Sequence, residues 1–146
     1  MKKVMFVLLG LCIISLSQIA FANPYPKYLN GDTNFVMCLG HNGTGWYVDK
    51  SSLEVEKYAP PQYIIAVNVV RVDNVDKGNI DISDIQTLRF FYNYNLRRMY
   101  VDQDGNSDWS YINPDKGIGA TAVDEAGEMA FELAYKIKFY NKSIYE

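Results

Sequence analysis

Hydrophobic and polar residues alternate in short runs between residues 34 and 112, which is the pattern of β-strands separated by turns. The strongest run, residues 63–72, is rich in β-branched side chains and apolar on both faces, so we expect a central strand that is covered on both sides. Residues 85–94 predict a second long strand with alternating faces. Shorter strands are predicted over residues 34–39, 46–49, 54–58, 97–102 and 109–112, of which 54–58 is expected to lie at an edge.

The turns between these runs decide how the strands are arranged. A glycine-rich loop fills residues 40–45, residues 93–96 form a short turn, and Asp104-Gly105 is a typical hairpin pair. Strands joined by such short turns are antiparallel. The sequence therefore predicts a β-meander of about five to six strands.

The pattern changes to helical spacing after residue 121. Residues 122–140 predict one C-terminal helix, with a capping box formed by Thr121 and Asp124 at its start. An apolar stripe would face the sheet, and Gly127 would mark the closest approach between helix and sheet; the stripe consists of Ala126, Ala130, Leu133, Ala134 and Ile137. The expected fold class is α+β, an antiparallel sheet with one helix packed on a face.

The N-terminus has the features of a signal peptide. Two lysines precede an apolar run over residues 4–19, and Ala20-Phe21-Ala22 forms a small-x-small cleavage site, so we place the cut between Ala22 and Asn23. A permanent membrane anchor is the alternative, but the cleavage site and the lack of a second apolar segment favour removal. The predicted organisation is a signal peptide (1–22), an extended leader (23–33) and a single domain (34–146). The protein is then exported, to the periplasm, the cell surface or the extracellular space.

Cleavage would change the charge and the cysteine content of the chain. Loss of Lys2 and Lys3 changes the net charge from −3 to −5, and an acidic chain is unsuited to nonspecific nucleic-acid binding. Cys12 would leave with the signal peptide, so Cys38 would remain without an intramolecular partner. A buried, inert thiol and a bridge between two chains are the two interpretations of Cys38, and we favour the first.

The sequence offers little catalytic chemistry. His41 is the single histidine, and its C-x-x-H spacing with Cys38 provides too few ligands for zinc. No hydrolase elbow, phosphate loop or metalloprotease motif is present, although paired carboxylates on neighbouring strands would leave no such signature. Residues 102–108 resemble a calcium loop in composition, but aligning Gly105 with the loop glycine puts tyrosines at the first and last ligand positions. We therefore interpret this segment as an Asp-Gly hairpin turn, and expect neither catalysis nor a cofactor nor a metal.

Aromatic residues are numerous, with twelve tyrosines and two tryptophans in 146 residues. Such side chains serve both as cross-strand pairs and as anchors at recognition surfaces. The residues that we select as a candidate binding patch surround one hairpin, although strand alternation directs the two arginines to opposite faces; they are Tyr92, Tyr94, Arg97, Arg98 and Tyr100.

The order of these elements resembles a known family. The signal peptide, the segment 46–53 with its Tyr-x-Asp-x-x-Ser motif, the strands 63–72 and 89–94 and the C-terminal helix are similar in order to the surface-adhesin protein E family of bacterial exported proteins. The resemblance spans about residues 45–140 and implies an antiparallel sheet with the terminal helix on one face, and adhesion to host extracellular proteins. Adhesin-type members carry a cysteine pair that joins the sheet to the helix, whereas the predicted helix of this chain contains no cysteine.

These observations favour an exported, noncatalytic binding module of the envelope or surface, adhesin-like in action, with a host or envelope protein as partner and no permanent membrane anchor after cleavage. A large exposed aromatic patch would support this hypothesis. A small envelope enzyme is the alternative, and a concave pocket with two converging carboxylates would support it. An accessory or inhibitor protein acting on an envelope neighbour is a third hypothesis.

Overall fold

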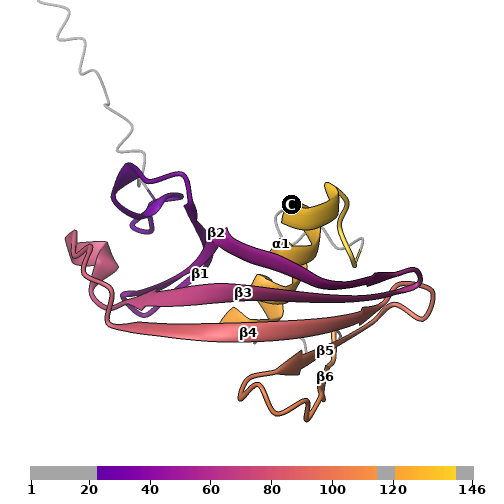
Figure 1. Ribbon diagram of the computed structural model, residues 1–146. Helices are drawn as coiled ribbons and strands as arrows, with labels where there is room; N and C mark the ends of the chain where they lie inside the picture. Colours follow the sequence, from indigo (N-terminus) through magenta and orange to yellow (C-terminus); the bar gives the residue numbers. More distant parts are fainter. Residues whose placement is uncertain (1–22, 115–120, 141–146) are drawn as a thin grey trace, which may run out of the picture.

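The computed structural model describes residues 23–114 and 121–140, which form one six-stranded antiparallel sheet and one α-helix (Figure 1). The strands follow the chain order across the sheet, from β1 at one edge to β6 at the other. Their bounds are β1 (Phe35–His41), β2 (Thr44–Ala59), β3 (Gln62–Val72), β4 (Asp84–Asn93), β5 (Arg98–Asp102) and β6 (Ser110–Ile112). The predicted α+β meander with one C-terminal helix is therefore confirmed.

The first two predicted strands after the glycine-rich loop are in fact one. Residues 46–49 and 54–58 both belong to β2. The first part pairs with β1 and with β3, whereas segment 54–58 pairs with β3 alone and has no described strand on its other side, as expected of an edge. Its pairing with β3 shifts in register between Asp49 and Glu54. Ser52 Oγ donates to the carbonyl of Asp49 (2.7 Å) and accepts from the N–H of Asn68 on β3 (2.8 Å). The Asp-x-x-Ser part of the sequence motif thus bridges this irregularity, and polar side chains replace ladder hydrogen bonds there.

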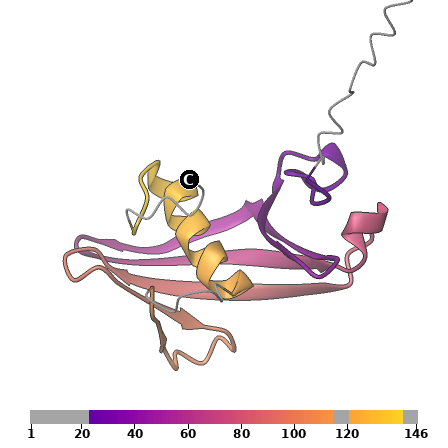
Figure 2. The ribbon, with the colours of Figure 1, turned by 180° about the vertical axis from the view of Figure 1, so that it is seen from behind.

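The helix α1 (Ala122–Tyr135) crosses one face of the sheet, as Figure 2 shows. The predicted capping box is present, since Thr121 Oγ1 accepts from the N–H of Asp124 and the Asp124 carboxylate accepts from the N–H of Thr121. Gly127 is buried against the sheet, and a Cβ there would lie only 2.6 Å from Met99 Sδ. The main core lies between this helix and the sheet, around Phe90, Tyr92 and Phe131.

The helix ends five residues earlier than predicted, at Tyr135. Lys136 adopts a left-handed conformation (φ 61°), and residues 136–140, which we call the C-terminal turn, fold back so that Phe139 is fully buried. Arg97 Nη1 donates to the carbonyl of Phe139 (2.8 Å), and the N–H of Tyr140 donates to the Glu128 carboxylate. These tertiary contacts outweigh helix propagation, and they leave Ile137 exposed instead of on the apolar stripe.

A second, smaller core covers the opposite face near the β1–β2 turn. Leu29 in a short 3₁₀ turn, η1 (Leu29–Gly31), packs against Tyr47, Val70 and Val72 together with Val75 from a second 3₁₀ turn, η2 (Val75–Lys77). Residues 23–33 are therefore not a free extended leader, because burial of Leu29 and the bridge between Tyr28 and Val36 join them to the domain. This packing also explains why β3 is apolar on both faces.

Within the described residues no helix is long and apolar enough to cross a membrane. The predicted signal peptide, residues 1–22, lies outside the described residues.

Candidate functional site: the helix-free face of the sheet

The five residues predicted as one binding patch lie on two different faces of the sheet. Tyr92 is 0% exposed beneath α1, where its hydroxyl donates to the carbonyl of Gly127 (2.7 Å), so it is not available to a partner. Tyr94 stacks on Phe131 on the same side. Arg98 and Tyr100 belong to the helix-free face, because they pair with Asn93 and Phe91 of β4. The predicted single patch is therefore wrong, since strand alternation divides its members between core and surface.

Arg97, another member of that patch, has a structural role at the β4–β5 turn. Its guanidinium lies 3.9 Å from the centroid of the Tyr94 ring and donates to the carbonyl of Phe139. Arg97 also adopts a positive φ of 50°, an uncommon conformation for a residue other than glycine. Through these contacts Arg97 joins the β4–β5 turn to the C-terminal turn.

A different aromatic cluster crosses the helix-free face. Phe91, Tyr100 and Tyr111 stand directly opposite one another on β4, β5 and β6, with Phe91 also opposite Ile64 of β3. Ring centroids are 5.7 Å apart for Phe91–Tyr100 and 5.4 Å for Tyr100–Tyr111, and Trp109 lies 5.9 Å from Phe91. We call Phe91, Tyr100, Trp109 and Tyr111 the aromatic patch. Tyr111 is exposed and the other three are partly exposed, so the patch presents ring surface to solvent.

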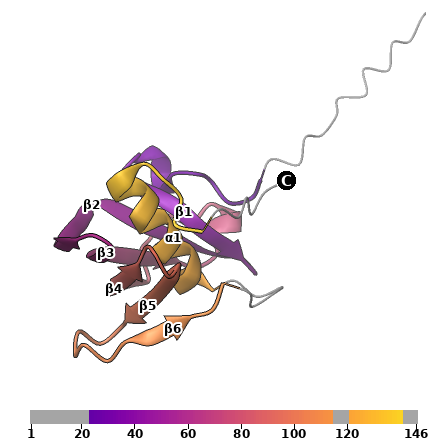
Figure 3. The same cartoon turned by 90° about the vertical axis from the view of Figure 1, so that its right-hand side faces the viewer.

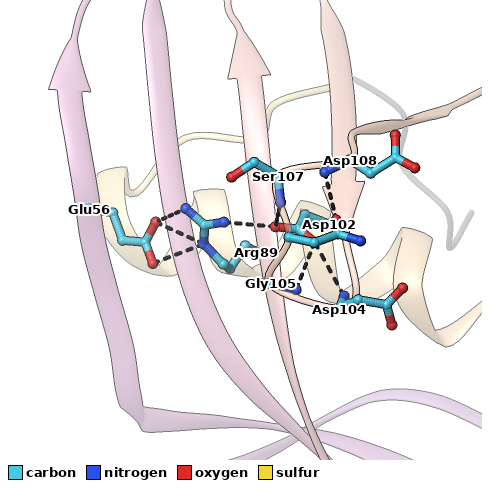
Figure 4. Close-up of polar contacts among 8 residues, drawn as sticks. Glu56, Arg89, Asp102, Asp104, Gly105, Ser107 and Asp108 are labelled. Carbon is cyan, nitrogen blue, oxygen red and sulfur yellow. Dashed lines mark hydrogen bonds and ion pairs between the residues drawn. The ribbon is translucent and has the colours of Figure 1, made fainter.

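An ionic network supports this patch from the adjacent row of the sheet (Figure 4). Arg89 of β4 stands opposite Ala66 and Asp102, and the small Ala66 leaves space for its side chain. Its Nη1 donates to Asp102 Oδ2 (2.7 Å), while Nε and Nη2 donate to the Glu56 carboxylate. The guanidinium also lies 5.3 Å from the Trp109 ring centroid. One side chain thus connects β2, β4, β5 and the loop before β6, and restricts the position of Trp109.

The Asp102 carboxylate organises the β5–β6 loop. It accepts from the backbone N–H groups of Asp104, Gly105 and Ser107 in addition to Arg89, although its side chain has no exposed area. Burial disfavours its ionisation, but the hydrogen bonds from Ser107 and Arg89 outweigh burial and lower the pKa of Asp102. Hydrogen bonds to Glu56 chiefly raise the pKa of Arg89. Both groups are therefore charged at neutral pH.

This loop has the geometry of a turn. Gly105 has a positive φ of 71°, as the Asp-Gly turn requires, and Asp102 directs its oxygens to protein donors. The described part of the chain contains no group of three or more side chains of the types that ligate metals.

A polar hollow of about 230 Å³ lies beside the same loop, lined by Val101, Gln103, Asp104, Asp108 and Ser110. Asp104 and Asp108 are both exposed, and in Figure 4 their carboxylates point away from Arg89. The hollow is thus open and acidic.

The two residues with C-x-x-H spacing lie in different environments. Cys38 is buried, its Sγ lies 3.3 Å from the carbonyl oxygen of Trp46, and burial raises the pKa of the thiol to about 12. His41 is exposed at the end of β1. The Cys38 thiol is therefore protonated at neutral pH, and its hydrogen-bond partners are the backbone carbonyls of Trp46 and Ala122.

The residues that sequence reasoning missed are Glu56, Arg89 and Asp102 of the network and Phe91, Trp109 and Tyr111 of the patch. The available signal was an arginine in the middle of the strongly hydrophobic strand 85–94, which requires a partner if it is partly covered. The partners lie 33 and 13 residues away and depend on strand register.

Comparison with protein-family models, with curated proteins and with solved structures finds no match for this chain.

Proposed function

We propose that this protein is an exported, noncatalytic module that binds a host or envelope protein through the aromatic patch. The observation that carries the proposal is the continuous row of partly exposed rings on the helix-free face, restrained by cross-strand pairing and by Arg89. Tyrosine, tryptophan and arginine are the residues that most often dominate binding energy at protein interfaces. A row that is already ordered in the free protein loses little conformational entropy when a partner binds.

Adhesion is the form of this function that the resemblance to the surface-adhesin protein E family favours. Export, to the periplasm, the surface or the extracellular space, is part of the same proposal. Cell fractionation with N-terminal sequencing tests it, and we expect a mature form that begins at Asn23. A protein recovered with Met1 intact would contradict processing.

The binding step is tested by capture on the purified protein from two sources, a set of host matrix proteins and an extract of the bacterial envelope. A Tyr100→Ala/Tyr111→Ala variant should lose the captured partner, because it removes two neighbouring rings of the patch. Ile80→Ala/Ile82→Ala is the matched control, since both side chains are exposed on the loop before β4 and lie outside the patch. Capture from the host set alone would support adhesion, and capture from the envelope alone would support an accessory or inhibitor protein. Equal capture by wild type and by the double variant would overturn the proposal.

A small envelope enzyme is the alternative, and its chemistry would lie in the hollow beside Asp104 and Asp108. Both carboxylates are exposed, whereas catalytic acids and bases are usually tuned by burial. This difference favours the noncatalytic module.

A further inference from the structure

Three separate segments meet at the end of the sheet that carries the β2–β3 and β4–β5 turns, seen from that side in Figure 3. They are residues 57–64, 93–98 and 133–140, which we call the basic end. The N–H of Tyr94 donates to the carbonyl of Pro61 (2.8 Å), which joins the first two segments. Arg97 joins the second to the third through Phe139, and the rings of Tyr58 and Tyr135 lie 6.1 Å apart.

The basic end contains five cations and no acidic residue; they are Lys57, Arg97, Arg98, Lys136 and Lys138. The whole chain has a net charge of −3, so the chain without these five residues carries −8. Among the described residues, the ion pairs involve only Arg71 and Arg89 as cations, and neither belongs to this end. Lys57 and Lys136 donate to neutral oxygens, of Gln62 and Leu133.

Three carboxylates border these segments, fewer than their five cations, and one of them, Glu128, accepts from the N–H of Tyr140. Glu56, which precedes the first segment, is bound to Arg89. Glu132, which precedes the third, is exposed and forms no ion pair with a described residue. Positive charge is therefore concentrated at one end of an otherwise acidic protein.

Each of the three segments also exposes a large apolar side chain. Tyr58 is 68% exposed, Leu96 is 61% exposed and Ile137 is 47% exposed. Apolar side chains surrounded by lysine and arginine are the composition of surfaces that insert shallowly into the interface of an anionic bilayer. The lysine and arginine heads then face lipid phosphates while their stems and the apolar groups enter the interface.

We propose that the basic end is a peripheral docking surface for an anionic lipid bilayer. Charge complementarity favours an anionic partner, and three apolar side chains on separate segments suit a fluid interface better than a single fixed acidic peptide. Each cation near an anionic membrane surface contributes about 1 kcal/mol. The surface is separate from the aromatic patch, so each proposal can fail without the other.

Sedimentation with lipid vesicles tests this proposal. The protein is purified from the cells that express it, and N-terminal sequencing identifies its first residue. The vesicles are phosphatidylcholine alone, or equal parts of phosphatidylcholine and phosphatidylglycerol. We expect binding to the anionic vesicles only, weakened by salt. Arg98→Gln/Lys138→Gln should weaken it by roughly twentyfold or more, because about fivefold is lost for each charge. Leu96→Ser should also weaken it.

Matched controls come from the opposite end of the molecule. Lys27→Gln/Lys77→Gln makes the same charge change, and Ile85→Ser changes an equally exposed side chain, since Ile85 is 59% exposed. Both controls should bind as wild type does. Absence of binding to anionic vesicles, or equal loss in the controls, would overturn the proposal. The proposal would also be overturned, in favour of an acidic protein partner, if soluble polyglutamate displaced the protein from the vesicles and the Leu96→Ser variant bound them as wild type does.

Discussion

Arg89 and Asp102 form a 2.7 Å ion pair across β4 and β5, and the Asp102 side chain has no exposed area. The pair stands next to the aromatic patch and at the start of the β5–β6 loop. It therefore connects the stability of the loop with the order of Trp109.

Replacing Asp102 by alanine should destabilise the protein and disorder the β5–β6 loop. The change leaves Arg89 with one carboxylate partner instead of two and removes the acceptor for three backbone N–H groups. Urea unfolding measures the stability, and the fluorescence anisotropy of Trp109, made the single tryptophan by Trp46→Phe in both variants and in the reference protein, measures the order of the loop. Asp108→Ala is the control, because the Asp108 side chain is exposed on the same loop. An equal loss of stability in both variants would show that Asp102 does not organise the loop.

Glu128 should make the protein less stable as the pH rises through neutrality. Burial, opposed by the N–H of Tyr140 and reinforced by Glu125 and Glu132, raises the pKa of Glu128 to about 7. This folded-state pKa lies above the unfolded value of about 4.5. The stabilisation that the proton provides is therefore complete below pH 4.5 and is lost as the pH rises through 7. Urea unfolding at pH 5 and pH 8 should show this decline, and Glu128→Gln should reduce it. An unchanged decline in Glu128→Gln would refute the assignment, with Glu54→Gln as the exposed control.

Adding one methyl group at Gly127 should destabilise the interface between helix and sheet. A Cβ there would meet Met99 Sδ at 2.6 Å and Phe90 Cε1 at 2.9 Å, and overpacking of this kind costs about 1–3 kcal/mol, although alanine favours the helix by about 1 kcal/mol. Thermal or urea unfolding measures the net effect. Because Met99 is the nearest neighbour, Met99→Ala should be less destabilising in the Gly127→Ala background than in the wild type. Strict additivity of the two changes would contradict the contact.

Phe139→Ala should cost about 3–5 kcal/mol in unfolding free energy, because it empties a fully buried aromatic site. Ile137→Ala, two residues earlier in the same turn but 47% exposed, should cost about 0.5 kcal/mol or less. Urea unfolding of the two variants compares them directly. Similar values would show that the C-terminal turn is not docked on the core.

Cys38 should react slowly with a soluble disulfide reagent in the native protein and rapidly after unfolding. Burial and the charge of Glu125 raise the pKa of this thiol to about 12, so little thiolate forms at neutral pH. The reaction is followed by the absorbance of the released thiolate at pH 7.5, with and without urea. Rapid native reaction, or a Cys38-linked dimer on a nonreducing gel, would favour the bridging interpretation instead.

The local features of the fold were accessible from the sequence because they depend on neighbouring residues. Strand periodicity, short turns and the Thr121–Asp124 capping box are properties of a few consecutive positions, and they predicted the meander and the start of the helix correctly. The expected close approach at Gly127 followed from a single residue type. The end of the helix did not follow, because the positive φ of Lys136 accompanies the burial of Phe139 in a core built from distant segments.

The aromatic patch and the ionic network depend on strand register and on packing between distant segments, which local sequence patterns do not reveal. Period-two alternation correctly separated Arg97 from Arg98, but the covered face of each strand is set by the position of α1, so Tyr92 became core. The row of Phe91, Tyr100 and Tyr111 exists because two strand registers align these residues, and a one-residue shift in either of them would separate the rings. The sequence by itself determined the type of the elements and their order, while the signal peptide stays a prediction. Only the tertiary structure decided which side chains meet, because register and packing are settled by contacts between segments far apart in the chain.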